Sequence, residues 1–180
     1  PISLHKNLEA IAQNKINHVI LEASSHGLEQ KRLDHIDFKI GIFTNLSHDH
    51  LDYHKNMHSY FNSKMHLFKN LLNKDSKIIT DEENKEFKFI KKIADQRRIK
   101  RITIGNNSGN IKILYNKYIG NKQFVKISVH SKTHTIEIPL IGYFQIKNLL
   151  IATLAASSCG IDINKIINQI NKIKPVSGRL

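Results

Sequence analysis

An apolar run that ends in a cluster of histidines and aspartates constrains this chain more than any other feature. Residues 38–46 read as a buried strand, and Ser47, His48, Asp49 and His50 follow at once. A second apolar run, residues 19–21, leads directly into Glu22. Short apolar runs of this kind are typical of buried parallel strands, and ligands of open α/β sheets bind beyond the carboxyl ends of such strands. The sequence therefore predicts a parallel sheet with acid and imidazole groups along one edge.

A helix is predicted after this cluster, and one position of its buried face holds a lysine. Within residues 56–73 the apolar side chains follow the i, i+3, i+4, i+7 spacing of an amphipathic helix, at Met57, Tyr60, Phe61, Met65, Phe68, Leu71 and Leu72. Lys64 falls in that stripe. A lysine placed there loses hydration, which lowers its pKa unless a charge pairs with it. The alternative is that its ammonium group reaches the surface.

The acid and imidazole groups at the predicted edge suit a divalent metal ion. Carboxylates with few nitrogen donors favour Mg²⁺ or Mn²⁺. Histidine alone would have indicated zinc, but the chain has one cysteine and no H-E-x-x-H pattern, which argues against a zinc hydrolase. Taken by itself, Glu22 could equally cap the turn that follows it.

The chain alternates helix-like and strand-like segments up to residue 104 and then changes character. The expected elements before that point are a helix over residues 4–15, a strand over 77–80, a helix opened by three acids over 81–95 and a strand over 101–104. Three strand-like stretches follow, over residues 111–118, 124–130 and 133–138. Helices are predicted again over residues 149–158 and after Asp162. We therefore expect an α/β fold with a mostly parallel sheet flanked by helices and a small antiparallel sheet over residues 110–138.

Composition excludes some classes of protein and leaves others open. The 28 basic and 15 acidic residues give a net charge of +13, which suits nucleic acid, a membrane surface or a phosphorylated ligand. The basic residues are dispersed except at residues 91–92 and 97–101, and no aromatic-rich RNA-binding signature accompanies them. A coding bias toward Ile, Lys and Asn accounts for much of the charge. No run of 18 apolar residues is present, and the single cysteine excludes an internal disulfide.

Four motifs in a fixed order resemble those of the Mur ligases. They are Glu22-Ala-Ser-Ser-His-Gly-Leu, then Thr44-Asn-Leu-Ser-x-Asp-His-Leu-Asp-Tyr-His, then Tyr60-x-x-x-Lys64-x-x-Leu-Phe, and finally Gly142-x-Phe-x-x-x-Asn148 followed by Gly178-Arg179. The resemblance spans residues 22–179 and implies the P-loop NTPase-like fold of the family's central domain. The run over residues 24–32 is most similar to members that add the third residue of the peptidoglycan stem peptide.

The resemblance also implies roles at the predicted edge. Glu22 matches the carboxylate that binds Mg²⁺ on the ATP phosphates, and His50 matches the ligand of a second Mg²⁺. Lys64 matches a lysine that family members carry as a carbamate, made when CO₂ adds to the neutral amine. The carbamate is an anion that can hold Mg²⁺, and it would account for a lysine on a buried face.

Further residues match the binding positions of the family. Ser24, Gln30 and Arg32 correspond to residues that hold the UDP-muramyl-peptide substrate. Asn148 corresponds to the asparagine that contacts adenine, and Arg179 to the arginine that contacts the nucleotide. Two departures stand out: Gln145 replaces an asparagine of the adenine motif, and His48 stands where arginine is common.

The implied function is that of an ATP-dependent ligase in a bacterial cytoplasm, which joins an amino acid, expected to be meso-diaminopimelate, to UDP-N-acetylmuramoyl-L-alanyl-D-glutamate through an acyl phosphate. We expect a monomer that neither binds nucleic acid nor inserts into a membrane. No G-x-x-x-x-G-K-[ST] phosphate loop occurs in the chain. We expect that loop to lie upstream, the UDP-binding and amino-acid-binding domains to lie outside residues 1–180, and these residues alone to be inactive.

Other functions remain open at this point. Another Mur ligase or a folylpolyglutamate synthetase would share the motifs. A basic nucleic-acid-binding module would account for the charge. A histidine-rich metal-storage protein would use His48, His50, His54, His58 and His66.

Overall fold

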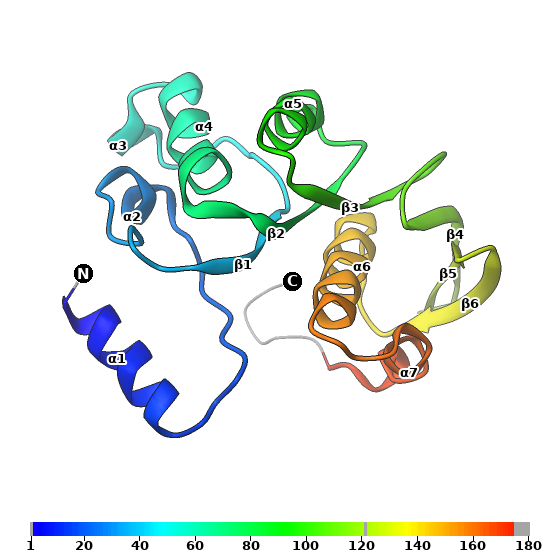
Figure 1. Cartoon of the computed structure of the whole chain (residues 1–180). Coiled ribbons are helices and arrows are strands. Elements are labelled where there is room, and N and C mark those ends of the chain that lie inside the picture. The colour runs from blue at the N-terminus through cyan, green and yellow to red at the C-terminus, as the bar shows by residue number, and fades with distance from the viewer. Residues whose placement is uncertain (1, 121, 175–180) are drawn as a thin grey trace.

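The computed structural model describes residues 2–120 and 122–174, and a six-stranded sheet forms its centre (Figure 1). The strands lie in chain order: β1 (Phe38–Phe43), β2 (Leu72–Asp81), β3 (Lys100–Gly105), β4 (Ile111–Ile119), β5 (Lys122–Val129) and β6 (Lys132–Ile138). The pairs from β1 to β4 are parallel, and those from β4 to β6 are antiparallel. The predicted α/β fold with a small antiparallel unit is confirmed.

Helices cover both faces of the parallel strands (Figure 1). The helical elements are α1 (Ile2–Gln13), α2 (Ser25–Glu29), α3 (Leu51–His54), α4 (Met57–His66), the π-helical turn η1 (Leu67–Leu71), α5 (Phe87–Arg97), α6 (Tyr143–Ser158), α7 (Ile163–Ile167) and the 3₁₀ turn η2 (Ile170–Lys172). α4 and α5 lie on one face and α6 on the other. Within the described residues, no helix is long and apolar enough to cross a bilayer.

Two apolar cores follow from this arrangement. One lies between β1, β2, α4 and α5 and includes Met65, Phe68 and Ile78. The other lies between α6, α7 and the antiparallel strands and includes Leu150 and Ile127. β3 and β4 are joined by two residue pairs, so α6 carries much of the contact between the two halves of the sheet.

The strand predicted over residues 19–21 is not present. The segment is extended but pairs with no described strand, and Ile20 is 97% exposed. An apolar run becomes a buried strand only where a neighbour offers ladder hydrogen bonds, and no described residue does so here. α1 likewise stands apart from the sheet and has no buried residue (Figure 1).

The three acids of residues 81–83 do not open the following helix, which begins at Phe87. Asp81 is instead the last residue of β2, is 1% exposed, and lies 2.6 Å from Lys147 Nζ on α6. Glu82 accepts a hydrogen bond of 2.7 Å from the Thr103 hydroxyl. Asp81 and Glu82, which were expected at the start of a helix, therefore pair with side chains on segments distant in the sequence.

The helix predicted over residues 56–73 is shorter and changes its pitch. Asn56 caps α4 by accepting from Ser59 N, and the last turn widens to the π-helical η1. The Arg97 guanidinium then donates to the carbonyl oxygens of Phe68 (2.8 Å) and Leu72 (2.7 Å). These bonds satisfy carbonyls that the end of a helix leaves without partners.

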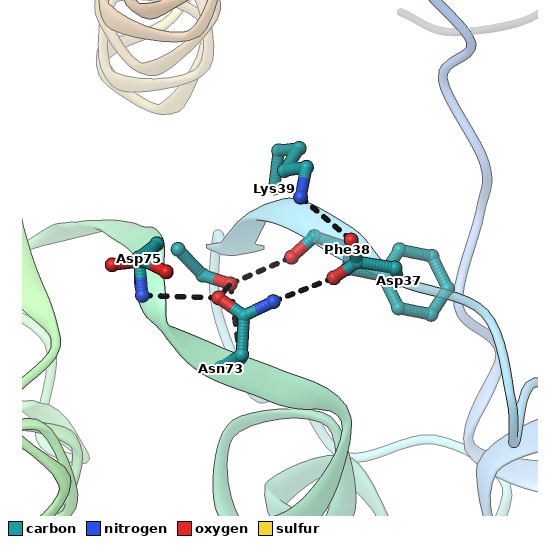
Figure 2. A network of polar contacts seen from close by, with 6 residues as sticks. Asp37, Phe38, Lys39, Asn73 and Asp75 are labelled. Carbon is teal, nitrogen blue, oxygen red and sulfur yellow. Dashed lines mark hydrogen bonds and ion pairs between the residues drawn. The ribbon is translucent and has the colours of Figure 1, made fainter.

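The amino ends of β1 and β2 are tied by a polar network, at the sheet edge opposite the predicted site (Figure 2). The buried Ser76 hydroxyl donates to Phe38 O at 2.7 Å and accepts from Asn73 N at 3.0 Å. Asn73 Nδ2 donates to Asp37 at 2.6 Å, and Asp37 also pairs with Lys39. The network lies beside the register shift between Phe38 and Ile40.

Replacing Ser76 with alanine is expected to lower the free energy of unfolding by about 1–3 kcal/mol, because the half-buried Phe38 carbonyl and Asn73 amide lose their partner. Urea titration followed by circular dichroism would measure the loss. The matched control is Ser47→Ala, which removes the same hydroxyl at an exposed position. Equal stability of the two variants would contradict the role given to this network.

Candidate functional site

Lys64 lies at the centre of the predicted site. It is half-buried on α4, and its Nζ lies 5.1 Å from the centroid of the Tyr60 ring. Burial lowers the pKa of the Lys64 ammonium group below its usual value, and the charges of Glu22 and Asp49 partly offset this by raising it. Both carboxylates are therefore near enough for their charges to act on the amine, and burial favours the neutral form that chemistry at nitrogen requires.

His50 also contacts Tyr60, and it is the N-cap residue of the single-turn helix α3. Its backbone is left-handed (φ 56°, ψ 24°), and its amide donates to Asp49 Oδ1 at 2.8 Å. The His50 ring meets the Tyr60 ring edge-on at 5.7 Å and the His26 ring at 5.2 Å. Lys64 and His50 both contact Tyr60, and the charge of Glu22 acts on Lys64, so the three predicted metal-binding positions belong to one region.

The fit of this region to a metal ion depends on the state of Lys64. Among the described residues, no three His, Cys, Asp or Glu side chains are grouped closely enough to hold a metal ion. The region offers the carboxylates of Glu22 and Asp49, whose charges act on the Lys64 amine, and the imidazole of His50, which shares the contact with Tyr60. A free ammonium group would repel a cation, whereas a carbamate would add anionic oxygen donors of the kind that Mg²⁺ prefers. The residues fit Mg²⁺ only with Lys64 modified.

The three predicted substrate-binding residues lie around the short helix α2. The Ser24 hydroxyl caps the helix by accepting from Gly27 N at 3.1 Å. Gln30 follows the helix and donates from Nε2 to the Tyr53 hydroxyl at 3.0 Å. Arg32 is exposed, and its amide donates to Gly27 O at 2.8 Å. Of the three, Gln30 contacts α3, and α2 itself approaches His50 through the His26 ring.

Asn148, one of the two predicted nucleotide-binding residues, is not part of this group. Asn148 is exposed on α6, across the sheet from α4 (Figure 1). The neighbouring Lys147 reaches Asp81 at the carboxyl end of β2, so Asn148 lies toward the same sheet edge as Lys64 but on the other face. Arg179 lies outside the described residues.

Several residues of the site have contacts that the sequence interpretation did not anticipate. Tyr60 was predicted as an apolar helix position and as part of a motif, without a role in the site, yet its ring touches His50, His54 and Lys64. His54 is buried, which lowers its pKa; Glu29 raises that pKa, and His26 lowers it further. One sequence signal could have indicated His54: it comes four residues, or one helical turn, after His50.

Fold and site together define the class of this protein. It is an α/β domain in which Asp49 and His50 follow the carboxyl end of β1, where such folds bind their ligands, and in which the half-buried Lys64 of α4 feels the charge of Asp49 and shares a contact with His50. The family model of the Mur ligase middle domain matches residues 1–156. The chain belongs to this family.

Curated relatives and solved structures agree with this assignment. The chain is 37% identical over 179 residues to the UDP-N-acetylmuramoyl-L-alanyl-D-glutamate–2,6-diaminopimelate ligase of Rickettsia bellii. The alignment spans 99% of this chain and 38% of that protein. This chain is 36% identical over 180 residues to the ligase of the same name from Chelativorans sp. (strain BNC1), of which it covers 37%. The chain therefore spans less than two fifths of the length of these relatives.

Two solved structures show the same fold. A UDP-N-acetylmuramoyl-L-alanyl-D-glutamate–2,6-diaminopimelate ligase superposes with a TM-score of 0.78 and 30% identity, over 88% of this chain and 33% of that one. The MurF ligase from Thermotoga maritima in complex with ADP superposes with a TM-score of 0.66 at 13% identity, over 84% of this chain and 34% of that one. The second likeness shows the fold alone.

Proposed function

We propose that this chain is the middle domain of an ATP-dependent ligase that adds meso-diaminopimelate to UDP-N-acetylmuramoyl-L-alanyl-D-glutamate. The observation that carries the proposal is Lys64, a half-buried lysine of lowered pKa that feels the charges of Glu22 and Asp49 and shares its Tyr60 contact with His50. The names of the relatives support the choice of substrates. The proposed setting is a bacterial cytoplasm, with the protein as a monomer.

The proposed reaction has two steps, and both gather negative charge. The substrate carboxylate attacks the γ-phosphorus of ATP, which gives an acyl phosphate and ADP. The incoming amine then attacks the acyl carbon, loses a proton and expels phosphate, which leaves the amide. Mg²⁺ held by Glu22, His50 and carbamylated Lys64 would neutralise charge on the phosphate oxygens. Ser24, Gln30 and Arg32 would hold the UDP-linked substrate beside this region, and Asn148 and Arg179 would bind the nucleotide.

The carbamate follows from the chemistry of the lysine. A neutral amine adds CO₂ through its lone pair and releases one proton, so the product carries a negative charge where the ammonium group carried a positive one. Burial favours the reactive neutral form of Lys64. The charge of the carbamate beside Glu22 and Asp49 would then require a cation, which is consistent with a bound Mg²⁺.

The proposal is tested by assaying the full-length protein that contains residues 1–180 with ATP and UDP-N-acetylmuramoyl-L-alanyl-D-glutamate. ADP release that depends on meso-diaminopimelate is expected, with little turnover on L-lysine. Residues 1–180 alone are expected to be inactive. Turnover only with a different UDP-linked acceptor or with a folate substrate would replace the proposal with another ligase of this superfamily.

A further inference from the structure

A chain of three side chains, two buried and one exposed, joins α2 to α3 beside the candidate site. His54 Nε2 lies 2.9 Å from the Ser25 hydroxyl, and His54 Nδ1 lies 3.4 Å from Glu29 Oε2. Ser25 is 2% exposed and His54 is 3% exposed. The carboxylate favours a proton on Nδ1, so we assign the Ser25 hydroxyl as the donor to Nε2.

The order of these groups is that of a serine nucleophile, its base and an orienting acid, but burial excludes that role. A nucleophile must be reached by its substrate, and both Ser25 and His54 are closed off from solvent. The chain of contacts therefore holds structure in place. The segments that these contacts hold together are identified by the residues next to Ser25 and His54.

His54 connects to three parts of the candidate site. Through Ser25 it is tied to the turn that begins α2, directly after Ser24. Its amide donates to His50 O at 3.0 Å, which closes the turn that begins at His50. Its ring stacks on Tyr60 at 5.2 Å and 25°, and Tyr60 in turn contacts Lys64.

We propose that His54 is a positioning residue, which fixes the substrate-binding turn at Ser24, the metal-binding turn at His50 and the helix of Lys64 in one arrangement through its contacts with Ser25 and Tyr60. The inference rests on the proposed function for its effect on catalysis. His54 itself touches no reacting group. Misplacement of reacting groups by about 1 Å is enough to cost roughly 100-fold in rate, so the effect should appear in kcat.

The test compares Ser25→Ala, His54→Leu, His54→Gln and the Ser25→Ala/His54→Leu double variant in the full-length protein. Ser25→Ala and His54→Leu are each expected to lower kcat by roughly 10-fold or more, with the KM for ATP within about twofold of wild type. The double variant should be no slower than the slower single variant, because both substitutions remove the same contact, the one between Ser25 and His54. His54→Gln keeps a polar atom near the Nε2 position and should recover part of kcat.

The matched control is His58→Leu, the same change at an exposed position of α4, and it should leave kcat unchanged. A second readout does not need ligase activity: the rate at which cyanate carbamoylates Lys64, followed by mass spectrometry. Loss of the Tyr60 stack should alter this rate at least threefold in His54→Leu, while thermal unfolding monitors folding in every variant.

The outcomes separate the two proposals. An inactive wild-type protein would overturn the proposed function, and the carbamoylation rate would still decide the role of His54. An active wild type with unchanged kcat in folded His54→Leu and Ser25→Ala would overturn the positioning role. So would losses in the two single variants that multiply in the double variant, or loss of kcat only in proportion to loss of folded protein.

Discussion

The full-length protein in which Lys64 is replaced by alanine is expected to turn over at least about 100-fold more slowly than the wild type. Without the carbamate, the Mg²⁺ that would offset the developing negative charge loses an anionic ligand, and electrostatic stabilisation of this kind contributes on this scale. The alanine removes the nitrogen that would carry the carbamate and leaves Glu22 and Asp49 without the third anionic donor. The loss should fall on kcat more than on the KM for the UDP-linked substrate, since Ser24, Gln30 and Arg32 lie around α2. Steady-state assays at saturating ATP would measure it.

Chemical rescue separates a carbamate from an ordinary lysine. Bicarbonate or a short-chain carboxylic acid should restore part of the turnover of Lys64→Ala, because a small anion can occupy the space of the carbamate. In the wild type, the lowered pKa leaves a larger neutral fraction of Lys64 at a given pH than of an exposed lysine. Cyanate should therefore react faster at Lys64 than at the exposed Lys69.

Lys69→Ala serves as the control for the alanine substitution, since this side chain is exposed in the π-helical turn that follows the same helix. It should retain full turnover and show no response to added acids. Full activity of Lys64→Ala would remove the carbamate from the mechanism. A loss that no small anion relieves would leave Lys64 acting as a cation.

Replacing Lys147 with methionine is expected to lower the free energy of unfolding by about 3 kcal/mol, because it leaves Asp81 buried without a partner charge. Methionine keeps most of the apolar stem, so the change isolates the ammonium group. Since α6 also carries Asn148, the KM for ATP should rise in the full-length ligase. Denaturant titration and ATP saturation curves provide the two measurements.

The double variant Asp81→Leu/Lys147→Met tests the cause of that loss. It removes both charges, so it should be more stable than Lys147→Met alone. Lys165→Met is the control, because Lys165 is exposed on the short helix α7. If the double variant were the less stable of the two, packing rather than an unpaired carboxylate would explain the effect.

The fold was predictable where its signal is local. The spacing of Tyr60, Met65 and Phe68 identified α4 because a helix repeats its buried face over a few residues. The prediction of a strand over residues 19–21 was wrong because a strand depends on a partner elsewhere in the chain. The prediction that the acids beginning with Asp81 open a helix was wrong for a similar reason. The partner of Asp81, Lys147, lies 66 positions further along the sequence (147 minus 81).

The same distinction applies to the candidate site. Lys64 was recognisable because its helical position contradicts its charge, and Glu22 and His50 because each follows an apolar run. His54 and Tyr60 gave no comparable signal. A buried histidine bonded to Ser25 and stacked on Tyr60 acquires those contacts only when three separate segments pack together.

The narrow junction between β3 and β4 has a consequence for the order of folding. β4, β5 and β6 pair with their immediate neighbours through short turns, so their contacts are local in sequence and close quickly. β1, β2 and β3 pair only after helical crossovers have formed, which requires larger loops to close. We expect the antiparallel hairpins and α6 to form an early nucleus on which the parallel strands assemble. Substitutions at Val125 or Ile127 should then slow folding, whereas substitutions at Ile78 should mainly speed unfolding.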